Sequence, residues 1–278
     1  MSTKLSALRH VRGFDVVRPI SIATIVAIML PLVLLPLLTI FVFGTSKGLG
    51  SFWAALTAPQ AIFALKLSMA TSFWATVFNV VFGLFAAYVL SRYDFRGRNA
   101  LIVTISLPTA IPTAVAGFAL LLLWGPNGTL GRLIEPHGIR IMYTAYAIIL
   151  ANIFVTFPLA FGVIKPVFDT MSRSLEEASA TIGATRWQTF WHVTLPSLRG
   201  AITAGALLTF ARALGEFGST ILVSGNMTMR TQTAPLYIFA KFNRGQVEAA
   251  NAVAIVLALL SFAIFSILFL ARDWLDTE

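Results

Sequence analysis

The 278-residue chain contains no cysteine. Disulfide bonds, thiolate metal sites and cysteine nucleophiles are therefore excluded. The three histidines, His10, His137 and His192, are scattered with no second metal ligand nearby, and no Ser-His-Asp set or carboxylate pair is arranged for catalysis. We expect no metal, no cofactor and no catalytic residue in this chain.

A phosphate-binding loop of the form G-x-x-x-x-G-K-[ST] is also missing. The nearest string, GTSKG at residues 44–48, has the wrong spacing and lies in a loop between apolar stretches. We therefore do not expect this chain to bind or hydrolyse ATP by itself.

Charged residues are scarce, at 11% of the chain, whereas soluble domains contain about 25%. Hydrophobic residues make up 58%, and the mean hydropathy is +0.84. This composition predicts a protein in contact with membrane lipid. A net charge of +9 also suits a nucleic-acid-binding protein, but the basic residues lie between apolar stretches, as they do in membrane proteins. We therefore expect no nucleic acid partner.

Six apolar stretches are each long enough to cross a bilayer core, which takes about 20 residues. They cover residues 20–43, 67–90, 101–124, 141–164, 201–223 and 249–270. The predicted fold is an all-α polytopic membrane protein with six transmembrane helices. Its domain spans residues 20–271, between an N-terminal tail (1–19) and a C-terminal tail (272–278). Residues 125–128 (GPNG) predict a turn, and residues 235–242 predict a short helix outside the spans.

The distribution of Lys and Arg predicts the orientation of the chain. If the N-terminus is cytoplasmic, twelve basic residues fall in inner segments and six in outer loops. The inner residues are Lys4, Arg9, Arg12, Arg18, Arg92, Arg96, Arg98, Lys165, Arg173, Arg186, Arg199 and Arg272. This bias predicts a multi-pass protein of the cytoplasmic (inner) membrane with both termini cytoplasmic. The long polar loop at residues 165–199 then faces the cytoplasm.

Local signals in this loop predict a helix, a sharp bend and a second helix. Ser174 with Glu177, and Thr185 with Gln188, each have the spacing of a capping box. Gly183 stands where a helix C-terminus needs a positive φ. Pro196 is suited to the first turn of the fifth span.

Both predicted loop helices carry apolar side chains at helical spacing. The first presents Leu175, Ala178 and Ile182, and the second presents Trp187, Phe190 and Trp191. Such helices dock into a partner's groove, and they also pack on the ends of their own spans or lie in lipid headgroups. Glu177 suits either a helix cap or a charged contact with a partner.

The fifth apolar stretch contains two charged residues, Arg212 and Glu216, four positions apart. Charges inside a membrane are costly, so we expect both to face the bundle interior and to pair with each other. Two roles remain open. The pair suits a gate or an anion pathway, and it equally suits a buried contact that fixes helix rotation.

The third stretch carries three hydroxyls, Ser106, Thr109 and Thr113, at spacings that place them on one face of an unbroken helix. Pro108 and Pro112 interrupt the same turns. One interpretation is a pathway-lining segment. The other is close helix packing through small residues, which include Ala110, Ala114 and Gly117.

Within the loop, one spaced pattern resembles the cytoplasmic coupling segment of binding-protein-dependent ABC importer permeases, E-A-A, G, I-x-L-P. The matching residues are Glu177, Ala178, Ser179, Gly183, Val193, Leu195 and Pro196. Ser179 and Val193 depart from it mildly. The resemblance implies a type I importer permease fold and ABC ATPase subunits that dock at residues 174–191, with coupling contacts that include Trp187.

Further strings resemble the sulfate/thiosulfate permeases of the oxyanion importers, which also include molybdate and tungstate permeases. They are FNVVFGL (78–84), SRYDFRGR (91–98), LPTAIPTAVAG (107–117), GEFGST (215–220) and SGN (224–226). Residues 230–233 (RTQT) and 125–128 are more similar to the molybdate branch. The resemblance implies a second permease subunit and an extracytoplasmic sulfate-binding protein. The rival interpretations are an ion-coupled secondary carrier and a membrane enzyme, for which the chain offers little.

Overall fold

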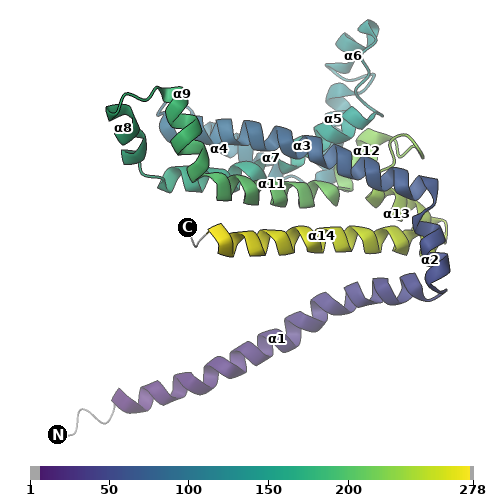
Figure 1. The fold of residues 1–278 in the computed structure, drawn as a ribbon. Coiled ribbons are helices and arrows are strands. Elements are labelled where there is room, and N and C mark those ends of the chain that lie inside the picture. The colour runs from purple at the N-terminus through teal and green to yellow at the C-terminus, as the bar shows by residue number, and fades with distance from the viewer. Residues whose placement is uncertain (1–6, 276–278) are drawn as a thin grey trace.

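The computed structural model describes residues 7–275, which are helical apart from short connections and contain no strand (Figure 1). The first half contains α1 (Ala7–Thr45), α2 (Leu49–Leu56), α3 (Pro59–Arg92), α4 (Arg98–Ser106), α5 (Thr113–Trp124), α6 (Gly131–Ile134) and α7 (Ala145–Thr170). The second half contains α8 (Ser174–Thr181), α9 (Arg186–Thr189), α10 (Leu195–Ser197), α11 (Arg199–Leu214), α12 (Gly218–Ser224), α13 (Ala234–Asn243) and α14 (Val247–Leu275). The all-α prediction is confirmed for this part of the chain.

Four helices within residues 7–275 are long and apolar enough to cross a membrane, and two bent helix pairs raise the number to six. The four are the Pro19–Thr45 part of α1, α3, α7 and the Val247–Ile267 part of α14. The bent pairs are α4 with α5, at 108°, and the α9–α10 stretch with α11, at 65°. Candidate helices therefore cover the six predicted spans. The third is bent by 108°, and the fifth, predicted at residues 201–223, is interrupted between the end of α11 at Leu214 and the start of α12 at Gly218.

Prolines produce the bend in the third span. Helix α4 passes into a short 3₁₀ turn at Leu107–Thr109, which contains Pro108, and α5 begins only after Pro112. Each proline removes a backbone donor and blocks a regular helical turn. The interruption within residues 101–124 is the one that the two prolines predict from the sequence.

Helices α3, α7 and α11 form the packed centre of the bundle. Small residues permit the approach: a Cβ placed on Gly83 of α3 would lie 3.4 Å from the Ala160 Cβ of α7, and one on Gly205 of α11 would lie 3.6 Å from the Ala160 oxygen. Between α3 and α7, Asn79 Nδ2 donates to Thr156 Oγ1 at 2.8 Å, and both residues are buried. Close backbones with interhelical hydrogen bonds are typical of membrane helix packing.

Helix α1 contributes little to this core. Its most apolar window is 0% buried inside the chain, and Figure 1 shows it diverging from the bundle toward its N-terminal end. Contact is made near its end, where Gly44 is buried against Ile255 of α14, and Lys47 Nζ lies 2.6 Å from Glu248 Oε1.

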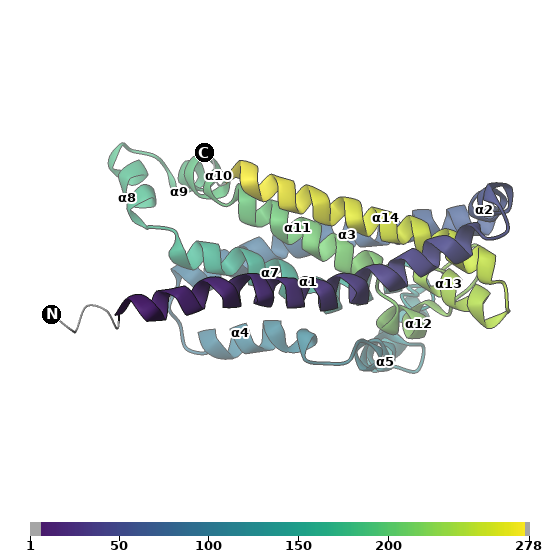
Figure 2. The same cartoon turned by 90° about the horizontal axis from the view of Figure 1, so that it is seen from below.

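The two ends of the molecule differ in content. The start of α1 and the end of α14 lie on the same side as α8 and α9, whereas α2 and α13 lie at the opposite end (Figures 1 and 2). Helix α13 confirms the helix predicted at residues 235–242, and the Gly128 N–H···O=C Gly125 bond of 2.8 Å confirms the turn. Helix α1 begins inside the predicted tail 1–19, and α14 runs into the predicted tail 272–278. Lys4 and residues 1–6 and 276–278 lie outside the described residues.

Candidate functional site: the elbow and the polar break in the fifth span

Helices α8 and α9 form an elbow whose bend lies at Gly183. Gly183 has φ +89°, which L side chains rarely adopt. The N–H of Gly183 donates to Ala180 and that of Ala184 to Ser179, which closes the end of α8. Thr185 caps α9 with the complete capping box expected from its spacing with Gln188.

The capping box predicted for Ser174 and Glu177 is wrong. Ser174 is the first residue of α8 rather than its cap, and the N-cap position is held by Arg173 without a side-chain cap bond. The Ser174 N–H donates to the Ser172 hydroxyl at 3.2 Å, and the two serine hydroxyls lie 2.7 Å apart. This local serine turn takes the place of the reciprocal Ser–Glu arrangement.

Hydroxyl groups tie the two arms of the elbow together. Ser179 on α8 and Thr189 on α9 have hydroxyl oxygens 2.6 Å apart, and Ser179 is 7% exposed. Alanine at this position of the coupling pattern could not make that bond. The departure from the pattern therefore adds a polar contact here.

An apolar surface remains uncovered on the elbow. Leu175 is 50% exposed, Ile182 85%, Trp187 69% and Trp191 47%. The rings of Trp187 and Trp191 lie 5.5 Å apart, edge to face. Ala178 is also exposed. Exposed apolar patches of this kind mark interaction sites.

The remaining predicted coupling residues differ in placement. Glu177 is exposed, Leu195 is half-buried and Pro196 is exposed. A π-helical turn at Phe190–Thr194 precedes Pro196, which lies inside α10. Pro196 lies in the first turn of α10, as predicted for the helix that follows the elbow. The long helix of the fifth span, α11, begins three residues later, at Arg199.

A contact that the sequence did not indicate joins the elbow to the bundle. Arg92, the last residue of α3, donates from Nη2 and Nε to Glu176 Oε1 at 2.9 and 3.2 Å. Thr194 Oγ1 donates to the same oxygen at 3.2 Å. The two charged residues are 84 positions apart, so no local pattern could reveal the pair.

In the fifth span, Arg212 and Glu216 form the expected pair, with Nη1 2.6 Å from Oε2. Glu216 does not lie on a helix, however, but in the break between α11 and α12. Its side chain is 1% exposed, and Oε1 accepts from the Ser219 N–H at 2.8 Å and the Ser219 hydroxyl at 2.9 Å. The carboxylate therefore joins the end of α11 to the start of α12.

Helices α5 and α12 approach closely beside this break. A Cβ placed on Gly117 would lie 2.6 Å from the Ser219 oxygen, and one on Gly218 would collide with the Thr113 hydroxyl. Of the three predicted hydroxyl residues, only Thr113 lies at this contact. Ser106 and Thr109 are exposed on the far side of the 108° bend and donate to Ile102 and Ser106 carbonyls. The proposed single hydroxyl face is therefore wrong.

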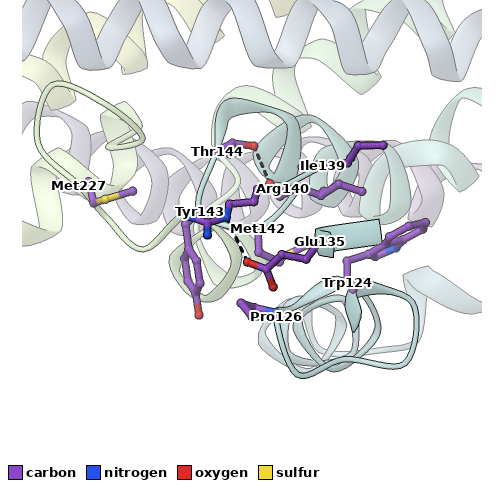
Figure 3. A pocket seen from close by; sticks show the side chains of 11 residues that line it. Trp124, Pro126, Glu135, Ile139, Arg140, Met142, Tyr143, Thr144 and Met227 are labelled. Atoms are coloured by element: carbon purple, nitrogen blue, oxygen red, sulfur yellow. Dashed lines mark hydrogen bonds and ion pairs between the residues drawn. The ribbon is translucent and has the colours of Figure 1, made fainter. Parts of the chain in front are cut away.

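A pocket of about 260 Å³ lies at the other end of the molecule, between the end of α5, the start of α7 and the loop after α12. Figure 3 shows Arg140 and Glu135 turned toward each other beside Trp124 and Tyr143. Arg140 Nε lies 3.1 Å from Glu135 Oε1. An arginine neutralised by its neighbour provides a weak field for an anion.

Comparison with known proteins agrees with this architecture. The chain is 37% identical to the sulfate transport system permease protein CysT of Escherichia coli (strain K12), over 95% of this chain and 94% of that one. It is also 37% identical to the sulfate transport system permease protein CysW of Synechocystis sp. (strain ATCC 27184 / PCC 6803 / Kazusa), over 88% and 89%.

Solved structures share the fold. A chain of a bacterial ABC transporter involved in alginate import aligns with a TM-score of 0.75 at 20% identity, covering 97% of this chain and 99% of that one. A chain of the MetNI methionine ABC transporter aligns with a TM-score of 0.56, covering 80% and 99%. Together they show the type I importer permease fold of a multi-pass membrane protein. Residues 79–278 match the family described as binding-protein-dependent transport system inner membrane component, and the chain belongs to that family.

Proposed function

We propose that this chain is a transmembrane permease subunit of an ATP-driven importer that carries sulfate or thiosulfate across the cytoplasmic membrane. The observation that carries the proposal is the 37% identity to the Escherichia coli sulfate permease over 95% of this chain. The exposed apolar elbow supports it, because a permease without its own phosphate-binding loop needs a surface that receives force from an ATPase.

The proposed assembly joins this chain to three kinds of partner. Two ABC ATPase subunits dock at residues 174–191 and hydrolyse ATP, with Glu177 and Trp187 at the contact. A second permease, either a copy of this chain or a related subunit, completes the pathway. An extracytoplasmic binding protein delivers the anion. Both termini and the elbow are cytoplasmic, in keeping with the position of α8, α9, the start of α1 and the end of α14 at one end of the molecule (Figure 1).

The anion is proposed to cross a wet pathway rather than a tight cationic site. A tetrahedral dianion loses much hydration free energy in a dry pocket. Arg212 is paired with Glu216, which reduces its attraction for an anion. Selection between sulfate, thiosulfate and molybdate or tungstate then takes place mainly in the binding protein.

Reconstitution tests the proposal. Vesicles that contain the permeases, the ATPase and the binding protein should accumulate radiolabelled sulfate only when ATP is supplied. Unlabelled thiosulfate should compete, and molybdate should compete less. Stronger competition by molybdate would assign the chain to the alternative substrate class. Uptake by this chain alone without nucleotide would overturn the proposal.

Dependence of uptake on a proton gradient distinguishes an ATP-driven importer from an ion-coupled carrier. A carrier needs a membrane carboxylate free to exchange protons, and Glu216 is held by Arg212 and Ser219. Collapse of the gradient with an ionophore should leave ATP-driven uptake unchanged. Loss of uptake in that arm would favour the carrier.

A further inference from the structure

At the end of α3 that faces the elbow, one carboxylate connects three segments of the chain. Glu176 Oε1 accepts hydrogen bonds from Arg92 of α3 and from Thr194 in the π-helical turn that precedes α10. Glu176 itself belongs to α8. One oxygen atom therefore joins α3, the first arm of the elbow and the segment that leads into α11.

Aromatic rings enclose the arginine side of this cluster. The Arg92 side chain is 9% exposed, and its guanidinium lies 5.7 Å from the centre of the Phe168 ring on α7. The Tyr88 ring lies 6.0 Å from both Phe168 and Phe190. Exclusion of water from a guanidinium strengthens its interaction with a carboxylate.

Apolar packing does not hold α8 against the bundle. Ser179 is the one buried residue of α8, and a pocket of about 330 Å³ opens between α8, α9 and the end of α3. A second polar link, from Arg173 Nη2 to the Ser91 oxygen, is long at 3.4 Å. The Arg92–Glu176 pair is therefore the strongest described non-covalent connection between α8 and α3.

We propose that the Arg92–Glu176 pair is a positioning strut that makes α3 follow the elbow when an ATPase moves it. This inference rests on the proposed function. The two neighbouring carboxylates then have different roles: Glu176 points to its own chain, whereas Glu177 is exposed. Without the strut, α8 would turn about Gly183 and leave α3 behind.

The first test measures uptake and ATP hydrolysis in the same reconstituted complex. In Arg92→Gln and Glu176→Gln, sulfate taken up per ATP hydrolysed should fall about tenfold, the loss expected for a hydrogen-bonded charge pair. In the double variant Arg92→Glu with Glu176→Arg, the amount of sulfate taken up per ATP hydrolysed should be about threefold higher than in either single charge reversal. Lys165→Gln is the matched control, because it breaks an ion pair between two residues of α7 and leaves in place the hydrogen bond from Ser91 of α3 to Asp169. An unchanged ratio in Arg92→Gln would overturn the strut.

The second test needs no transport and uses the absence of cysteine. Spin labels at Asp94→Cys, after the end of α3, and Thr181→Cys, on α8, report the distance across the strut; both positions are exposed. With the native pair, the distribution of distances between the two labels should stay narrow in nucleotide-free and ATP-bound complexes. With Glu176→Gln, this distribution should broaden. Equal distributions for the native pair and for Glu176→Gln would overturn the strut, whatever the transport result.

The two proposals fail in different ways. Absence of ATP-dependent uptake in the unmodified complex contradicts the importer function but leaves the label distances to judge the strut. Normal uptake with normal ATP use in Glu176→Gln contradicts the strut and leaves the importer function intact.

Discussion

At the scale of single residues, the positions that most restrict the choice of amino acid are Gly183 and the Arg212–Glu216 pair. Gly183 has open space around the position of a Cβ, so its only requirement is a left-handed φ. Glu216 is the opposite case, because its backbone is unexceptional and its buried carboxylate needs three donors. Substitutions at these positions should therefore act by different mechanisms.

Gly183→Pro should uncouple ATP hydrolysis from transport, because proline fixes φ near −65° and cannot adopt +89°. We expect sulfate uptake to be lost while the complex still hydrolyses ATP. Gly183→Asn is the matched control, since asparagine tolerates the left-handed region at a cost of about 1 kcal/mol. Normal uptake by Gly183→Pro would refute the role of the elbow.

Loss of Arg212 should cost more than loss of the charge on Glu216. Arg212→Gln leaves a carboxylate that is 1% exposed without its cation, at a cost on the order of 3 kcal/mol. In Glu216→Gln, the amide oxygen still accepts from Ser219, and Arg212 is 40% exposed, so the cost should stay near 1 kcal/mol. Thermal unfolding in detergent measures both. A larger loss of stability in Glu216→Gln than in Arg212→Gln would contradict the description of Glu216 as the buried member of the pair.

At the scale of elements, the features that could be predicted from the sequence are those that depend on neighbouring residues in the chain. The Thr185 cap and the positive φ of Gly183 depend on neighbouring residues alone, and both were predictable. The hydroxyl face failed because its geometry assumed an unbroken helix across Pro108 and Pro112. The Arg92–Glu176 contact depends on the packing of distant helices, which no short pattern encodes.

The crossing of α5 and α12 gives a packing prediction. Gly117→Ala places a Cβ 2.6 Å from the Ser219 backbone oxygen, and overpacking of this kind costs about 1–3 kcal/mol. Gly162→Ala on α7 is the control, because no atom lies within 4 Å of its Cβ position. That variant should gain about 0.5–1 kcal/mol from helix propensity. A lower unfolding temperature for Gly162→Ala than for Gly117→Ala would contradict the described crossing.

At the scale of the whole molecule, six apolar stretches were enough to predict the all-α, multi-pass class of the fold. The bias of basic residues also predicts its sidedness, which stays a prediction. The bent third span and the separate α12 were beyond a span count, because length and hydropathy carry no information on direction. The order of the helices in the bundle likewise depends on contacts such as Gly83 with Ala160.

Sidedness is directly testable, because the chain has no native cysteine to label. Single cysteines at the exposed positions Thr181 on the elbow and Asn127 in the GPNG turn should behave oppositely. A membrane-impermeant maleimide added to intact cells should modify the residue at 127 and spare that at 181. Disruption of the membrane should make both reactive. Modification of position 181 in intact cells would invert the proposed topology.

The exposure of α1 has a consequence for how proteins of this shape vary. The helix lies outside the packed centre, and its most apolar window is 0% buried within the chain. A segment that buries none of its apolar window within its own chain can be gained or lost without repacking the rest. Substitutions between apolar residues in this window should therefore leave the mutual fit of α3, α7 and α11 unchanged.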